Sequence, residues 1–172
     1  MRLKIDKSTR HSKIIGDFGE NLVCNWLSRS GFEVTRVDHT GIDVVAYKRG
    51  RGRLGIAVRS RTRVGGQESS SVTLFNHGKD DRAKVKKACT VFACKPWIAV
   101  YVEAKDHADL YLTSLQHCDR KYRGRGDRAI DDWKMNRERR DGYASDPNVS
   151  HIRFTFAGSG SGGILGGRDE PD

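Results

Sequence analysis

The chain has 172 residues, with 32 Lys and Arg against 22 Asp and Glu, which gives a formal net charge of +10 at pH 7. This length suits one domain with short additions, and the longest apolar run, 97–102, is far shorter than the about 20 residues that span a bilayer. The composition therefore excludes a membrane-spanning helix, and the polar, basic start predicts no secretory signal.

The excess of positive charge favours a polyanionic partner such as nucleic acid, with plain solvation of the surface as the alternative. The four cysteines are irregularly spaced, which favours free thiols over a disulfide framework or a structural zinc site. We expect a cytoplasmic protein that binds nucleic acid and no membrane.

The first half of the chain predicts a helix followed by three strands. Apolar residues recur at helical spacing from Ser12, the expected N-cap, to a stop at Ser30 and Gly31. Strand-like runs follow at 32–37, 42–47 and 54–61, and the turn between the last two predicts a hairpin.

The second half predicts a brief strand at 72–75, a helix at 79–94, and strands at 97–102, 109–115 and 151–156. Between the last two, an arginine-rich stretch contains Ile130 and Trp133, which are expected to anchor a short helix. The expected organisation is a basic arm (1–11), a layered α/β or α+β core (12–118), an Arg-rich appendage (119–156) and a flexible tail (157–172).

One carboxylate interrupts an apolar strand. Asp43 lies among Ile42, Val44 and Val45, and a buried charge there needs a partner because an unpaired one is costly. If the second and third strands pair through their hairpin, Arg59 lies near Asp43 on the same sheet face.

The segments Gly16–Glu20, Gly31–Val34, Thr40–Ala46 and Gly55–Arg61 occur in an order that resembles the PD-(D/E)XK nuclease superfamily. The similarity is greatest to its restriction-endonuclease-like and Holliday-junction-resolvase-like branch. The resemblance implies a three-layer core with a mixed central sheet, in the order helix, three strands, helix, strands. It also implies a metal-dependent phosphodiesterase acting on duplex or branched DNA, in a family where homodimers are common.

Carried over residue by residue, the resemblance makes Glu20 and Asp43 the carboxylates that hold Mg²⁺ or Mn²⁺, with the main-chain carbonyl of Val58 as a further ligand. The family's third-strand acid is replaced by Ala57, and its Lys by Arg59, so the motif is degenerate. Arg59 keeps the positive charge but cannot act as a base, because a guanidinium does not deprotonate in proteins. Gln67 or Glu68 could supply a displaced ligand.

Three functions remain open. The first is a Mg²⁺-dependent endonuclease with a weakened active site, in which Glu20, Asp43 and Arg59 are catalytic. The second is an inactive nucleic-acid-binding module, in which Asp43 and Arg59 form a structural ion pair. The third is a structural or assembly protein with a basic surface.

No acidic residue occurs between Asp43 and Glu68. This acid-free segment contains seven cations: Lys48, Arg49, Arg51, Arg53, Arg59, Arg61 and Arg63. Cations of this density, interleaved with glycine, predict contacts to DNA phosphates that set affinity without reading sequence. The alternative is a solvated hairpin tip.

Overall fold

A computed structural model of the chain describes residues 7–75, 81–123 and 131–156. Its elements, in order, are α1 (His11–Arg29), β1 (Glu33–His39), β2 (Ile42–Lys48), β3 (Gly52–Thr62), β4 (Val72–Phe75), α2 (Asp81–Val91), β5 (Lys95–Glu103), β6 (His107–Ser114), α3 (Leu115–Lys121), β7 (Asp131–Trp133), α4 (Arg137–Ser145) and β8 (Val149–Thr155). No helix of this described part is long and apolar enough to cross a membrane.

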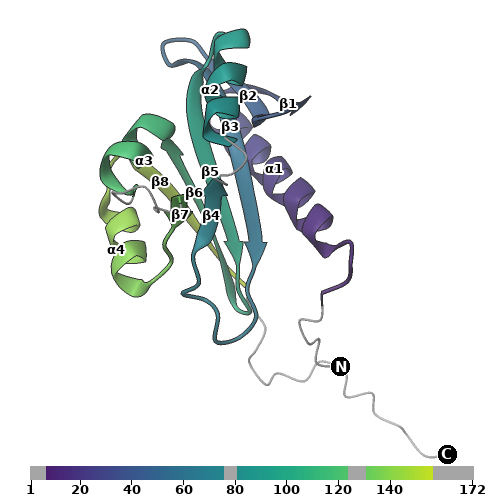
Figure 1. Cartoon of the computed structure of the whole chain (residues 1–172), viewed down its shortest axis with the longest axis vertical. Helices are drawn as coiled ribbons and strands as arrows, with labels where there is room; N and C mark the ends of the chain where they lie inside the picture. Colours follow the sequence, from purple (N-terminus) through teal and green to yellow (C-terminus); the bar gives the residue numbers. More distant parts are fainter. Residues whose placement is uncertain (1–6, 76–80, 124–130, 157–172) are drawn as a thin grey trace, which may run out of the picture.

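Six strands form a central sheet in the order β1-β2-β3-β5-β6-β8 (Figure 1). Neighbouring strands are antiparallel except for β3 and β5, which run parallel and are connected through α2. The predicted α/β class with a mixed sheet is therefore confirmed. The antiparallel β4 and β7 form a separate two-stranded sheet.

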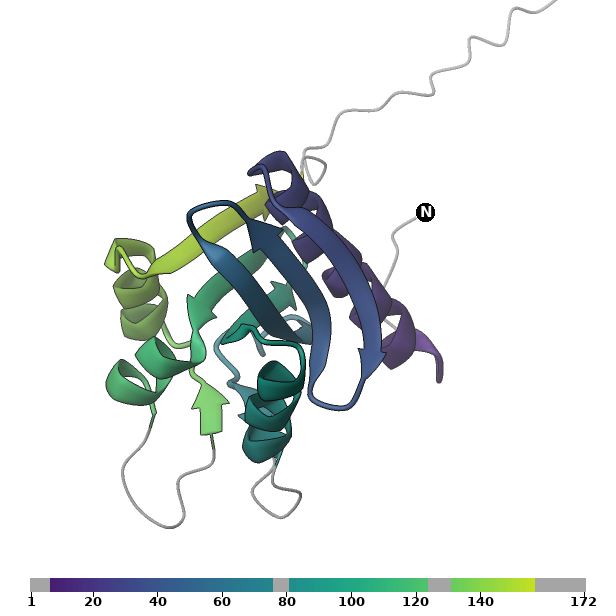
Figure 2. The same ribbon diagram turned by 90° about the horizontal axis from the view of Figure 1, so that it is seen from above.

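Helix α1 covers one face of the sheet, and α2, α3 and α4 lie on the other (Figure 2). The close approach of α1 depends on Gly19, because a Cβ atom built there would lie 2.1 Å from the Ser60 Oγ atom on β3. Buried Val23 and Leu27 on α1 pack against Val58 and Ala99 on this face. This contact fixes the neighbouring Glu20 beside the β1–β2 hairpin.

The opposite face has a second core that is rich in aromatic residues. Trp133 and Tyr143 are each 1% exposed, and their rings stack with centroids 3.9 Å apart. The prediction that Trp133 anchors a helix is wrong: Trp133 lies in β7, where it pairs with Val72, because ring stacking and strand pairing outweigh the helical pattern around it. Ile130, the other expected anchor, lies outside the described residues.

The N-terminal end of the described chain differs from the predicted pattern in detail. Helix α1 begins at His11 with Arg10 as its N-cap, so the expected cap at Ser12 is wrong. Part of the expected basic arm contacts the sheet, since the Lys7 ammonium donates a hydrogen bond to the Thr62 carbonyl at 2.6 Å. The expected tail, 157–172, lies outside the described residues.

Candidate functional site

The candidate site lies where β2 and β3 separate. Their antiparallel ladder runs from Lys48 opposite Gly52 to Val44 opposite Ile56. One residue beyond it, the Asp43 carboxylate accepts a hydrogen bond from the Val58 amide at 2.6 Å. The carboxylate thus replaces a ladder bond and holds open a fork, while β3 continues alongside β5 as far as Thr62.

Arg59 fills this fork. Its Nε–H donates to the Leu74 carbonyl on β4 at 2.9 Å, and its Nη1 donates to the Val58 carbonyl at 2.9 Å. The same Nη1 lies 3.8 Å from the Asp43 carboxylate, so the expected proximity of Asp43 and Arg59 is found. With 27% of its side chain exposed, Arg59 links β3 to β4 and still faces solvent.

Burial raises the pKa of Asp43 above its usual value. The Val58 amide and the charges of Arg59 and Arg36 act in the opposite direction, but they do not outweigh the loss of hydration. The fork therefore holds a carboxylate that is only partly compensated by its neighbours.

Glu20 has a different partner, Arg36 on β1, which the sequence reasoning did not identify. Two nitrogens of Arg36 donate to the Glu20 carboxylate at 2.9 and 2.5 Å, and Arg36 also lies 3.2 Å from Asp17. Arg36 is opposite Val44 in the β1–β2 ladder, one residue from Asp43, so its charge lowers the pKa of Asp43 as well. The sequence signal for Arg36 is its place on the strand that pairs with the Asp43 strand.

The resemblance implies a divalent metal, and the arrangement of its expected ligands does not fit one. The Val58 carbonyl accepts from Arg59, the Glu20 carboxylate accepts from Arg36, and Asp43 accepts from the Val58 amide. These bonds leave Glu20 Oε1 and Asp43 Oδ1 without a hydrogen bond from a described residue, but the guanidinium groups of Arg36 and Arg59 already lie beside the two carboxylates, where a Mg²⁺ ion would need near-octahedral oxygen ligation. Within the described ranges, no group of three or more His, Cys, Asp or Glu side chains could hold a metal ion.

The remaining candidates do not complete a metal site. Ala57, at the family's acid position, is 1% exposed and belongs to the core on the α2 face. The Glu68 carboxylate accepts a hydrogen bond from the Gly66 amide at 3.0 Å within its own loop. Neither Glu68 nor Gln67 has a hydrogen bond to Asp43 or Arg59 in the part of the chain that is described.

The cations of the acid-free segment differ in exposure and in hydrogen bonding. Arg49, Arg51, Arg53 and Arg61 are exposed. Besides Arg59, main-chain carbonyls accept hydrogen bonds from four of the seven: Lys48, Arg53, Arg61 and Arg63. Of the seven, Arg59 alone has an ion pair with a described carboxylate. The hairpin tip lies at the far end of β2 from Asp43, so these cations extend along β3 rather than surrounding the fork.

The chain is similar to known proteins in structure. No protein-family model matches the sequence, and no curated protein matches it. Among solved structures, the chain is similar to Hjc, a Holliday junction resolvase from the archaeal hyperthermophile Archaeoglobus fulgidus. The TM-score is 0.49 at 18% sequence identity, over 69% of this chain and 83% of that chain.

Proposed function

We propose that this chain is a DNA-binding domain of the PD-(D/E)XK type, with a degenerate third-strand motif. The observation that carries the proposal is the acid-free segment, in which six of seven cations have no ion pair with any described residue. Cations without carboxylate partners can neutralise phosphates and release the counterions condensed on DNA, and this release drives binding.

The length of β3 supports a duplex as the ligand. The strand has 11 residues, which at about 3.3 Å per residue corresponds to roughly 33 Å. One turn of duplex DNA is about 34 Å long. Exposed Arg49 precedes this strand and exposed Arg61 lies near its end, so the two cations are spaced to meet phosphates on successive turns.

Binding of a labelled DNA duplex, measured by fluorescence anisotropy over a range of salt concentrations, tests the proposal. We expect the affinity to fall steeply and linearly on a log–log plot against salt. Arg49→Glu combined with Arg61→Glu should weaken binding by roughly tenfold or more, since each reversal replaces a phosphate contact by repulsion.

The matched control is Lys134→Glu combined with Arg137→Glu, which changes the net charge equally at exposed positions on the β7–α4 side. The control should retain binding within about threefold, because screened charges act over roughly 10 Å. Equal losses in both double variants, or binding that does not respond to salt, would contradict a site along β3.

Metal-dependent hydrolysis of DNA is the second candidate, and the position of Asp43 in the fork favours it. Hydrolysis would place a metal cation beside Glu20 and the Val58 carbonyl, where the guanidinium groups of Arg36 and Arg59 now lie, so we expect these two side chains to oppose it. We therefore expect supercoiled plasmid to remain intact with Mg²⁺ or Mn²⁺, for the wild type and Asp43→Asn alike. Nicking by the wild type that Asp43→Asn abolishes would establish the nuclease and overturn the binding-only proposal.

A further inference from the structure

A cavity of about 590 Å³ lies on the α1 face of the sheet, at the β2–β3 turn. Its walls come from the last turn of α1, the starts of β1, β3 and β5, the β2–β3 turn, β6 and β8. Neither Glu20, Asp43 nor Arg59 lines it, so it is distinct from the fork. Its volume is within the range of about 300–1,000 Å³ that is typical of ligand pockets.

The pocket exists because α1 stops short of this end of the sheet. The helix ends at Arg29, and Gly31, with φ +80°, turns the chain back into β1. Beyond that turn, Leu54 and Leu112 form part of an apolar floor at 5% exposure each. Leu27, near the end of α1, belongs to the same core cluster and borders the same cavity.

Three aromatic side chains stand around this floor: Trp26 from α1, Phe32 before β1 and Trp97 from β5. Each is partly exposed rather than fully buried in the core. Partly exposed aromatic rings that border one cavity offer flat faces on which a planar, aromatic ligand can stack.

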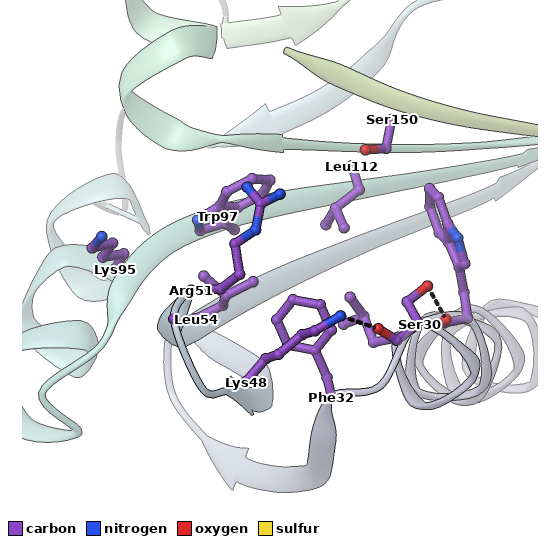
Figure 3. A pocket seen from close by; sticks show the side chains of 12 residues that line it. Ser30, Phe32, Lys48, Arg51, Leu54, Lys95, Trp97, Leu112 and Ser150 are labelled. Carbon is purple, nitrogen blue, oxygen red and sulfur yellow. Dashed lines mark hydrogen bonds between the residues drawn. The ribbon is translucent and has the colours of Figure 1, made fainter. Parts of the chain in front are cut away.

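Three cations, Lys48, Arg51 and Lys95, lie at the same cavity, and no Asp or Glu of the described chain lines it. Figure 3 shows Arg51 extending from the turn on the side of the cavity where Trp97 lies, and Lys48 passing Phe32 toward the Ser30 carbonyl, 2.7 Å from its ammonium. The Lys48 ammonium lies 5.5 Å from the centre of the Phe32 ring.

The charges of Arg51 and Lys95 are uncompensated. Their side chains have no hydrogen bond or ion pair with any residue in the described ranges, and both residues are exposed. An apolar ligand would leave these charges unused, and a simple inorganic anion would leave the aromatic walls unused. The lining therefore matches a ligand that combines a planar aromatic ring with a phosphate.

We propose that this cavity is a nucleotide-binding pocket, in which a base stacks on the aromatic walls and its phosphate meets Arg51, with Lys48 and Lys95 on either side. The nucleotide belongs either to the end of a DNA strand or to a free mononucleotide, and both present the same chemistry. Only the strand-end source rests on the proposed DNA binding; the pocket itself rests on its own lining.

Tryptophan fluorescence reports directly on this pocket, because two of the chain's three tryptophans line it and Trp133 is buried on the opposite face. The probes are adenosine 5′-monophosphate, adenosine, and a short oligodeoxyadenylate with or without a 5′-phosphate. We expect the phosphorylated probes to quench the fluorescence and adenosine to bind more weakly. Trp97→Phe should reduce the amplitude of quenching while keeping an aromatic wall.

Arg51→Glu combined with Lys95→Glu should weaken the phosphorylated probes by roughly tenfold or more. The matched control, Lys86→Glu combined with Lys87→Glu, changes two exposed lysines on α2, on the other face, and should bind within about twofold of the wild type. Absence of quenching in the wild type, or equal weakening in both double variants, would overturn the pocket.

The quenching assay distinguishes a strand end from a free mononucleotide as the ligand. Comparing it with the duplex-binding assay distinguishes the pocket proposal from the DNA-binding proposal. Preference for the 5′-phosphorylated strand over the mononucleotide identifies a strand end as the ligand, and the reverse identifies a free nucleotide. Quenching by adenosine 5′-monophosphate without duplex binding would sustain the pocket and refute the DNA-binding proposal. Duplex binding without quenching by any probe would refute the pocket alone.

Discussion

At the scale of single residues, two arginines decide the chemistry of the fork. The guanidinium of Arg59 lies between the Asp43 carboxylate and the Val58 carbonyl, where the resemblance implies a metal cation. Arg36 neutralises Glu20 in the same way. Because a guanidinium keeps its charge at every accessible pH, this neutralisation does not depend on a bound ion.

Two carboxylates, the partly buried Asp43 and the buried Asp109, affect stability in opposite directions as pH changes. The pKa of Asp43 is raised in the fold, so its contribution to the free energy of unfolding falls as pH rises through the unfolded value of about 3.8 toward the folded value. Asp109 is also desolvated, but hydrogen bonds from His151 and Arg153 outweigh that effect and lower its pKa. Its contribution is present above about pH 3.8 and is lost as pH falls toward the folded pKa.

With Asp109→Asn, the free energy of unfolding should therefore decrease less steeply than in the wild type as pH falls below about 3.8. Arg153 donates to both Asp109 oxygens at 2.8 and 2.9 Å, and the Asp109 side chain is 1% exposed. We expect a loss of about 1–3 kcal/mol in the free energy of unfolding at neutral pH, because the neutral amide loses the charge-assisted hydrogen bonds from His151 and from the half-exposed Arg153. Urea denaturation at a series of pH values measures both the loss and the slope.

The control for this prediction is Asp141→Asn, which changes an exposed carboxylate on α4. Its free energy of unfolding should remain within about 0.5 kcal/mol of the wild type. If the free energy of unfolding of Asp109→Asn and of the wild type fell in parallel between about pH 4 and pH 2, Asp109 would not be the source of the loss of stability in acid.

At the scale of elements, the β1–β2 turn is fitted against α2. Gly41 has φ +112°, and a Cβ atom there would lie 2.6 Å from the main-chain oxygen of Lys84. Gly50, in the β2–β3 turn, also has a positive φ of 82° but has nothing within 4 Å of the same position. A Cβ at Gly50 would therefore cost only backbone strain, whereas a Cβ at Gly41 would cost backbone strain and also a steric clash with α2.

We expect Gly50→Ala to lower the free energy of unfolding by about 1–2 kcal/mol, the cost of a left-handed conformation for a residue with a Cβ. Gly41→Ala should cost clearly more, because α2 must also move. Thermal and urea unfolding of both variants measure the difference. Losses of equal size would mean that the turn and α2 are not in fixed contact.

The elements that sequence reasoning predicted are those with an apolar period. The runs at 42–47, 54–61 and 97–102 lie within β2, β3 and β5, since each side of these strands packs against a core. By contrast, α4 contributes one buried residue, Tyr143, so it lacks the repeated apolar positions that predict a helix. The predicted strand at 109–115 extends one residue into α3, which begins at Leu115 because Ser114 caps it by accepting from the His117 amide.

The sequence predicted the part of the site that depends on the pairing of two strands joined by a short turn. The hairpin pattern was sufficient to predict that Asp43 and Arg59 are close. The partnership of Glu20 with Arg36 depends on the register of β1 against β2, which shifts between Arg36 and His39. No pattern in the sequence specifies that shift, because it results from how the turn packs against α2.

At the scale of the whole molecule, the net charge of +10 is unevenly compensated. The carboxylates Asp109 and Asp146 are enclosed by hydrogen-bond donors on the β6–β8 and α3–α4 side. The β2–β3 region lacks acids over the whole acid-free segment. The positive charges along β3 and at the β2–β3 turn, where the duplex and nucleotide proposals are both located, therefore have no acid of their own segment to offset them.

The single parallel pairing, between β3 and β5, also has a consequence for how the chain folds. On one side of this seam, β1, β2 and β3 are joined by short turns, and on the other β5 and β6 form a hairpin. Such antiparallel units can form from local contacts, whereas the seam requires closure of the loop that contains α2. Docking of the two halves along β3 and β5 is thus expected to be the slow step of folding, and that step also unites the two sides of the nucleotide pocket.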